Sequence, residues 1–441
     1  MNDERRTSGG QQAPAEGAPT EVAAAPAEPA APEAAGRAAA PEETSGFDQV
    51  TTESVFSGGP LAILARLGSL RVFIVLAIIW IIFQTQNSNF LSSFNLTNLV
   101  LQIAGVGMIS IGVTLILLLG EIDLSVGAVS GLAAAVMAVL NVNHGWSPIL
   151  AIVAALAVGC AIGVINGFFV TQFGIPSFVV TLAGLLAWQG ALLKVLGDTG
   201  TINITDAKIT GLTSTFYGDV FSWALAALVM AAYAASGIGE RFRRTRAGLA
   251  PPPLTGFLLR FAAVAAATIA AVAVLTSDRG VPLAGLILIG FCALLVFATE
   301  RTIWGRHVYA VGGNDEAARR AGIPVRRVRM MVFALASTFA AAGGVILAAR
   351  LQAVNQSSGG SDLLLLSIAG PVIAGTSLFG GRGSVWGALL GALVIGSISN
   401  GMDLLGLQSS DKFMITGGVL LVAVVIDALI RNERAKVLSR R

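Results

Sequence analysis

The sequence predicts an all-α polytopic membrane protein with about 12 transmembrane helices. Hydrophobic residues make up 55% of its 441 residues and charged residues only 12%, and the mean hydropathy is +0.78, far above that of a soluble domain. A helix needs roughly 20 apolar residues to cross the hydrocarbon core of a bilayer, and the chain holds many such runs. Its 52 glycines agree with helices that approach one another closely in a membrane.

The first 57 residues differ in composition from the rest of the chain. They are rich in Ala, Pro and Glu and carry ten acids against three bases. Repeated prolines interrupt helix formation, and there are too few large apolar side chains to form a core. We expect residues 1–57 to be a disordered cytoplasmic tail, residues 58–432 the transmembrane domain, and residues 433–441 a short basic cytoplasmic tail.

The number and direction of the spans can be tested against the charges of the loops. Arginines cluster in 239–254, in 300–327 and after 430, and cytoplasmic loops are enriched in Lys and Arg. All three clusters fall on one side if the count is even and both termini are cytoplasmic. The twelve predicted spans are 70–86, 97–119, 124–142, 147–172, 177–196, 218–238, 255–276, 281–299, 328–350, 362–379, 384–403 and 412–430.

The sequence holds few residues for catalysis or metal binding. No phosphate-binding G-x-x-x-x-G-K-[ST] motif is present. The only histidines, His144 and His307, lie in different predicted loops, and both cysteines lie inside apolar runs. We therefore expect no catalytic residue, no metal site and no cofactor bound by this chain. The basic residues lack the interleaved aromatics of a nucleic-acid interface, so no nucleic-acid partner is expected.

The predicted cytoplasmic segment at 305–327 encodes a short helix of about two turns, at 315–321. Asn314 is a good N-cap residue, and acids follow it in the first turn, where the helix dipole favours them. Gly322 can take the left-handed conformation after the helix, and Pro324 prevents its continuation. The small side chains of Ala317 and Ala318 would permit close approach by another protein.

Two Gly- and Ser-rich breaks interrupt apolar runs, at 120–131 (GEIDLSVGAVSG) and at 375–387 (GTSLFGGRGSVWG). Paired breaks of this kind point to a substrate path, although close packing of helices through small residues explains them equally. The candidate residues for a substrate path or helix junction are Glu121, Asp123, Ser125, Gly127, Thr376, Ser377 and, in the next span, Asn400.

These candidates have alternative roles that the sequence leaves open. Asp123 can cap the following helix by accepting a hydrogen bond from the amide of Ser125 or Val126. Glu121 could pair with an arginine on the cytoplasmic side or face the substrate exit. Asn400 could bond a substrate hydroxyl or a neighbouring helix. The segment 120–125 lies at the cytoplasmic end of a span by our count, but a break in mid-membrane is the alternative.

Three motifs resemble the permeases of bacterial sugar ABC importers of the ribose/xylose/arabinose group. They are GEIDLSVGAVSG at 120–131, GGNDEAARRAGIPV at 312–325, and the block IAGTSLFGGRGSVWGALLGALVIGSISNGMDLLG at 373–406. They occur in the order typical of that group, and the similarity runs from about residue 70 to 430. An extra predicted hairpin at 218–277 is closest to the xylose-type permeases. The acid-bearing L-D-A-I-A-A segment of the group is absent before the third block, where the nearest acid is Asp362.

The resemblance implies the transmembrane permease subunit of an ATP-driven, binding-protein-dependent importer of D-xylose or a related monosaccharide, working by alternating access. It implies a multi-pass protein of the bacterial inner membrane that is not itself an enzyme. The short helix would dock on a separate ABC ATPase subunit, which binds ATP and Mg²⁺. The docking residues would be Gly313, Asn314, Glu316, Ala317, Ala318, Gly322 and Ile323.

Further partners follow from the same resemblance: an extracytoplasmic sugar-binding protein, the sugar and membrane lipid. One chain has one coupling segment and a symmetric pair of ATPases needs two, so we expect a homodimer. A secondary, ion-coupled sugar carrier is the alternative. A proton-coupled carrier is expected to place a titratable acid in mid-span, whereas the ionisable groups within the predicted spans lie mostly near their ends.

Overall fold

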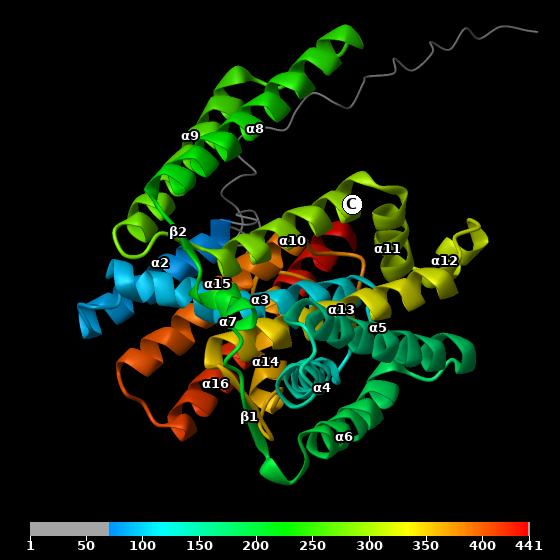
Figure 1. The fold of residues 1–441 in the computed structure, drawn as a ribbon. Helices are drawn as coiled ribbons and strands as arrows, with labels where there is room; N and C mark the ends of the chain where they lie inside the picture. Colours follow the sequence, from blue (N-terminus) through cyan, green and yellow to red (C-terminus); the bar gives the residue numbers. More distant parts are fainter. Residues whose placement is uncertain (1–69, 440–441) are drawn as a thin grey trace, which may run out of the picture. The chain divides into compact units, whose positions relative to one another are not determined.

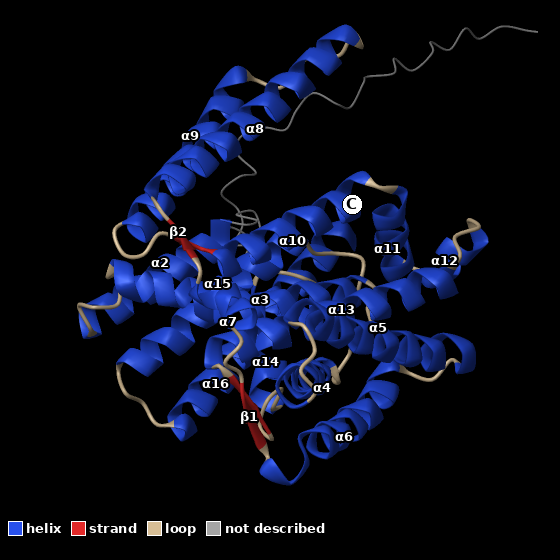
Figure 2. Cartoon of the chain, in the orientation of Figure 1, coloured by secondary structure: helices blue, strands red, loops and turns tan. Residues whose placement is uncertain are grey.

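The structure is a computed structural model that describes residues 70–439, so the predicted tail at 1–57 lies outside the described residues. Most of the described chain is helical (Figures 1 and 2). The first half contains the helices α2 (Leu70–Gln86), α3 (Ser93–Leu118), α4 (Val126–Ala138) with its π-helical extension η2 (Val139–Asn143), α5 (Pro148–Phe173), α6 (Ser177–Leu196), η3 (Gly197–Thr199), α7 (Ala207–Ser214) and α8 (Asp219–Arg246). The second half contains α9 (Leu254–Thr276), α10 (Leu283–Arg301), α11 (Ile303–Gly313), α12 (Asp315–Arg320), α13 (Val325–Leu351), α14 (Ser361–Ile373), α15 (Val385–Leu404) and α16 (Ser409–Ser439).

Each of the twelve predicted apolar runs coincides with a helix, but not every helix is long enough to cross a bilayer by itself. Among residues 70–439, nine helices have the length and composition of membrane spans: α3, α4 with η2, α5, α6, α8, α9, α10, α13 and α15. Helix α2 has 17 residues and α14 only 13, against the roughly 20 that a bilayer requires. The membrane crossings of α2, α14 and α16 stay predictions.

Within the same residues, two short antiparallel ribbons join the ends of helices. Strand β1 (Thr201–Asn203) pairs with β4 (Ala353–Asn355), with Ile202 opposite Val354. Strand β2 (Phe216–Tyr217) pairs with β3 (Val281–Pro282). The first ribbon links the segment after α6 to the segment after α13, and so fixes these two helix ends beside each other.

Helices α3 and α13 form the centre of the bundle. Helix α3 is buried along most of its length, and α13 packs against α3, α4 and α5. These contacts need glycine: a Cβ on Gly163 of α5 would collide with the carbonyl oxygen of Phe333, and a Cβ on Gly344 would collide with that of Ser130. Small residues therefore allow these backbones to approach, as is common between membrane helices.

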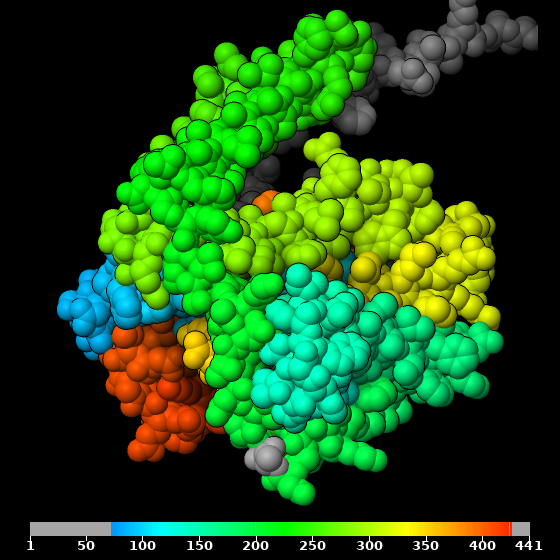
Figure 3. All heavy atoms as spheres, viewed as in Figure 1, coloured from blue at the N-terminus to red at the C-terminus, as the bar shows by residue number. Residues whose placement is uncertain are grey.

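Helices α8 and α9 form a hairpin with almost no buried side chains. They pack against each other, and their fully buried residues are Ser222, Ala226 and Val272. Large apolar side chains such as Leu228 and Leu259 are exposed, and in Figure 3 the upper part of the hairpin is uncovered on the face in view. A helix that is apolar on all sides is stable when lipid surrounds it.

Candidate functional site

The short helix predicted between two spans is present as α12, and its two ends are closed as the sequence predicts. The Asn314 side chain accepts a hydrogen bond from the Ala317 amide (2.9 Å). At the other end Gly322 has φ 81°, and its N–H donates to Arg319 O while Ile323 N–H donates to Ala318 O. This is a Schellman motif. The helix ends at Arg320, one residue earlier than expected.

The surface of α12 differs from the expected one at Ala318. Ala317 is exposed, but Ala318 is only 4% exposed and packs in the protein's own core with Val325 and Val328. Successive residues of a helix point about 100° apart, so the two alanines cannot share one face. Ala318 is therefore not available to another protein. Among the other predicted docking residues, Gly313, Asn314, Glu316 and Gly322 are exposed and Ile323 is half-buried.

Arg329, in the second turn of α13, joins α12 to the segment that follows α3. Its Nε lies 3.1 Å from Glu121 Oε1, and its Nη2 donates to Asp315 Oδ2 at 3.4 Å. Glu121 and Arg329 are 14% and 23% exposed, so water screens this ion pair little. Of the two roles considered for Glu121, pairing with an arginine is confirmed. We call the membrane side at which α12 lies the coupling side and the opposite one the outer side.

Asp123 organises the start of α4. Its Oδ1 accepts hydrogen bonds from the Ser125 N–H (2.8 Å) and hydroxyl (2.6 Å), so the predicted contact with the Ser125 amide is confirmed. Because α4 begins at Val126, Ser125 itself is the N-cap residue and Asp123 holds it in place. Ser125 Oγ also accepts from Asn166 Nδ2 of α5 (3.0 Å).

The junction 119–125 is irregular backbone between α3 and α4 and reaches into the bundle. The amides of Ile122 and Leu124 donate to Ser177 Oγ and Thr181 Oγ1 of α6. Asn166 stands seven residues before the end of α5 at Phe173, which is about 10 Å along the helix axis. Glu121 thus lies at the coupling side, whereas Asp123 and Ser125 lie deeper than the end of a span. Irregular backbone at such depth is tolerated where protein surrounds it.

The Asp123 carboxylate also faces a small cavity. Asp123 is 4% exposed, and within residues 70–439 its Oδ2 has no hydrogen-bond partner. It lines a cavity of about 100 Å³ whose other walls are apolar, including Ile368 and Leu378. This leaves a buried acceptor free to receive a hydroxyl group or water.

The second break, at 375–387, lies against the first. Gly381 N–H donates to Leu118 O (2.9 Å), and a Cβ on Gly380 would come within 2.8 Å of Gly120 N. A Cβ on Gly312, at the end of α11, would collide with Leu118 O. The two breaks and the segment leading to α12 therefore meet at the coupling side. Within the break, Thr376 is buried, and Ser377 Oγ accepts from the Phe379 amide.

The remaining candidates contact neighbouring helices. Asn400 and Asn95 exchange two amide hydrogen bonds, at 2.7 and 3.0 Å, which join α15 to α3. Of the two roles considered for Asn400, the bond to a neighbouring helix is confirmed. A Cβ on Gly127 would come within 2.9 Å of Gly359 O, so the start of α4 lies against the loop before α14.

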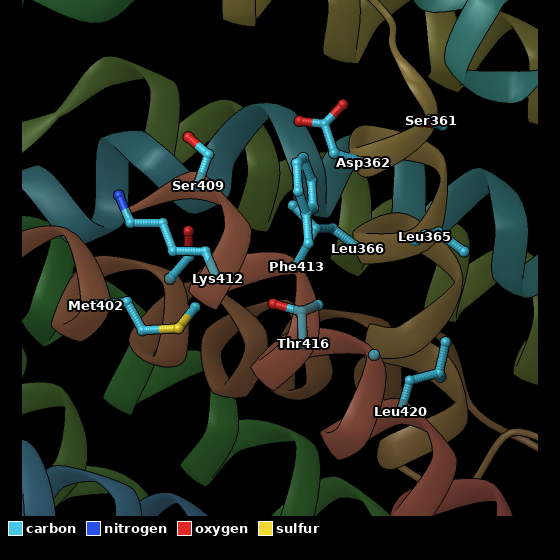
Figure 4. A pocket seen from close by; sticks show the side chains of 12 residues that line it. Ser361, Asp362, Leu365, Leu366, Met402, Ser409, Lys412, Phe413, Thr416 and Leu420 are labelled. Atoms are coloured by element: carbon cyan, nitrogen blue, oxygen red, sulfur yellow. The ribbon is translucent and has the colours of Figure 1, made fainter. Parts of the chain in front are cut away.

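An outer pocket, which the sequence did not predict, opens where three helix ends meet (Figure 4). It has a volume of about 430 Å³ and lies between the starts of α14 and α16 and the end of α15. Asp362, Lys412 and Phe413 line it, together with the hydroxyls of Ser399 and Thr416. Lys412 Nζ pairs with Asp403 at 2.6 Å, whereas the Asp362 carboxylate forms no ion pair within the described residues.

Asp362 stands between this outer pocket and a second cavity of about 310 Å³. That cavity lies between α4, α13 and the loop 353–360, and Ser130, Asn355 and Ser358 line it. Helix α13 begins beside α12 and its 27 residues extend about 40 Å, so both cavities lie toward the outer side. Six residues further along α14, Ile368 borders the Asp123 cavity. The three cavities thus follow α14 from the outer side toward the junction.

Comparison with known proteins gives a family for the chain. Residues 95–425 match the family described as branched-chain amino acid transport system / permease component. The chain is 36% identical over 369 residues to the xylose transport system permease protein XylH of Escherichia coli (strain K12), covering 83% of this chain and 93% of XylH. It is 32% identical over 356 residues to the ribose import permease protein RbsC of Bacillus subtilis (strain 168), covering 80% and 91%. It is 31% identical over 348 residues to the fructose import permease protein FrcC of Rhizobium meliloti, covering 78% and 81%. No solved structure matches the chain. The chain therefore belongs to the family of transport-system permease components that residues 95–425 match.

Proposed function

We propose that this chain is the transmembrane permease subunit of an ATP-driven sugar importer in the bacterial inner membrane, and that its substrate is D-xylose or a related monosaccharide. The observation that carries the proposal is the similarity to xylose, ribose and fructose permeases over about four fifths of the chain. A permease subunit is not an enzyme. ATP and Mg²⁺ would bind to a separate ATPase, and this chain would need no cofactor or metal.

The cavities along α14 suit a sugar better than an ion or an apolar amino acid. Ligand pockets have volumes of about 300–1,000 Å³ and a few polar groups on apolar walls. The outer pocket combines an open carboxylate, hydroxyls and the exposed Phe413 ring. Sugar hydroxyls can donate to Asp362, and the apolar face of the sugar ring can lie on Phe413. Asp123 would offer the next acceptor on the way to the coupling side.

The coupling mechanism we propose runs through Arg329. The ATPase would dock on the exposed part of α12 at Asn314, Glu316 and Ala317. Movement of α12 would then shift Arg329 through Asp315, and Arg329 would shift Glu121 and the start of α4. Such a rigid-body movement can open the path alternately to either side of the membrane.

We further propose twelve spans, with both termini in the cytoplasm and the coupling side as the cytoplasmic side. The arginines of the α8–α9 turn and Arg301 line one cavity, so these clusters share a membrane side, as the positive-inside rule requires. The permease would work as a homodimer, with one α12 for each ATPase, and receive sugar from an extracytoplasmic binding protein. The secondary-carrier alternative is not favoured by the relatives.

Uptake by whole cells tests this proposal. Cells that contain the permease, its ATPase and its binding protein should take up labelled D-xylose, and excess unlabelled L-leucine should not compete. Removal of the ATPase should abolish uptake. Uptake without the ATPase that collapses with a protonophore would support the carrier instead, and competition by L-leucine would contradict the sugar assignment.

A further inference from the structure

The coupling side also holds a pocket that is separate from the three cavities along α14. It has a volume of about 270 Å³ and lies between the facing ends of α8 and α9 and the last turn of α10. Four arginines line it: Arg241 and Arg243 of α8, Arg260 of α9, and Arg301 of α10. They come from three helices, so a single amphipathic face does not explain their convergence.

The charge of this pocket is not balanced by the protein. Its one lining acid, Glu240, pairs with Arg244 at 3.0 Å, and the Arg241 guanidinium donates to the Pro252 carbonyl. Across residues 70–439, Arg243, Arg260 and Arg301 form no ion pair with a carboxylate. Arginines gathered without counter-charges favour a bound anion, and their planar donors match phosphate oxygens.

The surroundings of the pocket favour a lipid as the source of the anion. Ile238, Phe242 and Leu258 are exposed on the same helix turns, at 59%, 56% and 51%. Arg260 lies six residues inside α9, so its position is that of a side chain reaching for the headgroup layer. Basic pockets between spans on the cytoplasmic side are suited to anionic headgroups, which are abundant in that leaflet.

We propose that this pocket binds the phosphate headgroup of an anionic phospholipid, with the acyl chains along the apolar surface of the α8–α9 hairpin. A bound headgroup would connect the hairpin to Arg301, two residues before α11, and so to the segment that leads to α12. The inference goes beyond sugar transport, and lipid binding can be measured whether or not the chain carries a sugar.

The test measures lipid retained by the purified chain in detergent, by native mass spectrometry. Added dioleoyl-phosphatidylglycerol should be retained in preference to dioleoyl-phosphatidylcholine. The double variant R260Q/R301Q should lose about 25-fold in affinity for phosphatidylglycerol, since each arginine near an anionic headgroup contributes about fivefold in affinity. The control R326Q/R327Q removes the same charge from exposed positions on the same side outside the pocket and should bind as the wild type does.

Two further measurements distinguish a lipid from a free anion and a lost contact from a misfolded variant. Inorganic phosphate at matched concentration should not displace the lipid, and displacement would show a site for a free anion instead. R260K/R301K keeps the charge but loses the planar donors, so it should fold and bind with intermediate affinity, which guards against a variant that fails to fold. Equal loss of lipid in the R326Q/R327Q control, or full retention by R260Q/R301Q, would overturn the proposal.

Discussion

Arg329 Nε lies 3.1 Å from Glu121 Oε1, and the same guanidinium reaches Asp315 at the start of α12. One side chain thereby connects the exposed helix α12 to the junction between α3 and α4. The Arg329 and Glu121 side chains are both more than three quarters buried, so their ion pair is held more rigidly than an ordinary surface ion pair. This geometry gives α12 a direct contact with the segment that bears Asp123.

The first prediction concerns this connection. R329Q should reduce sugar transport more than it reduces the ATPase activity of the assembled importer, because the ATPase can still dock while its movement is not passed on. Loss of a partly buried ion pair such as this one lowers the free energy of unfolding by on the order of 2 kcal/mol. E121Q should act in the same direction. R326Q, which alters an exposed arginine one turn earlier, is the control. Transport and ATP hydrolysis falling in equal proportion in R329Q would argue against a coupling role.

The second prediction separates two neighbouring alanines of α12. A317W should prevent copurification of the ATPase without lowering the melting temperature of the permease, because Ala317 is exposed. A318W should destabilise the permease itself, since Ala318 is buried against Val325 and Val328, and overpacking costs about 1–3 kcal/mol. Full transport by A317W together with normal recovery of the ATPase would show that α12 is not the docking site.

The third prediction concerns close packing in the centre of the bundle. G163A should lower the melting temperature, because the new Cβ would collide with Phe333 O and neither backbone can move freely. We expect a loss of about 1–3 kcal/mol. G290A is the matched control: it adds the same methyl group to a glycine of α10 with open space around it, where Ala favours the helix. Equal melting temperatures for the two variants would mean that α5 and α13 are not in this contact.

The fourth prediction concerns Asp123. D123A removes the acceptor of both Ser125 hydrogen bonds and should destabilise the start of α4 by about 1–3 kcal/mol, because buried donors of Ser125 lose their partner. D123N keeps an oxygen acceptor, so it should restore most of the stability. If Asp123 also receives the sugar, D123N should still transport more slowly. Wild-type stability and transport in D123A would exclude both roles.

The fifth prediction concerns the outer pocket. D362N should raise the half-saturating sugar concentration for uptake about tenfold, given the usual contribution of a hydrogen bond to a charged group. F413A should raise it too, because the apolar face of the sugar ring loses its contact with the Phe413 ring. Neither side chain is in a buried ion pair, so the melting temperature should not change. D411N alters an acid at the start of α16 that does not line the pocket and serves as the control. Unchanged uptake in both pocket variants would place the sugar elsewhere.

Local features were predictable from the sequence and distant contacts were not. Asn314, Gly322 and the Asp123–Ser125 contact involve residues within a few positions of one another, and their hydrogen bonds follow from residue type and spacing. The burial of Ala318 depends on how α12 lies on α13, which no local pattern specifies. Arginines on the cytoplasmic side were expected to be available to Glu121, but only packing of α13 against α3 selects Arg329.

The outer pocket shows the same limit most clearly. Asp362, Lys412 and Phe413 stand at helix ends that the sequence separates by many residues, and none of them carries a motif. The unusual position of the acid before the third conserved block was the one available signal. Spans were predictable because a bilayer demands long apolar runs. The run predicted at 362–379 nevertheless continues beyond α14, which ends at Ile373, because the Gly- and Ser-rich residues that follow form the break that lies against Gly120.

Sugar uptake by proteoliposomes is the most direct test of the central claim. The purified permease is reconstituted with its ATPase, with ATP and Mg²⁺ on the ATPase side and the sugar-loaded binding protein on the other. We predict D-xylose accumulation that requires ATP, persists in the presence of a protonophore and disappears when the ATPase is omitted. Accumulation by the permease alone, driven by an imposed proton gradient, would contradict the account.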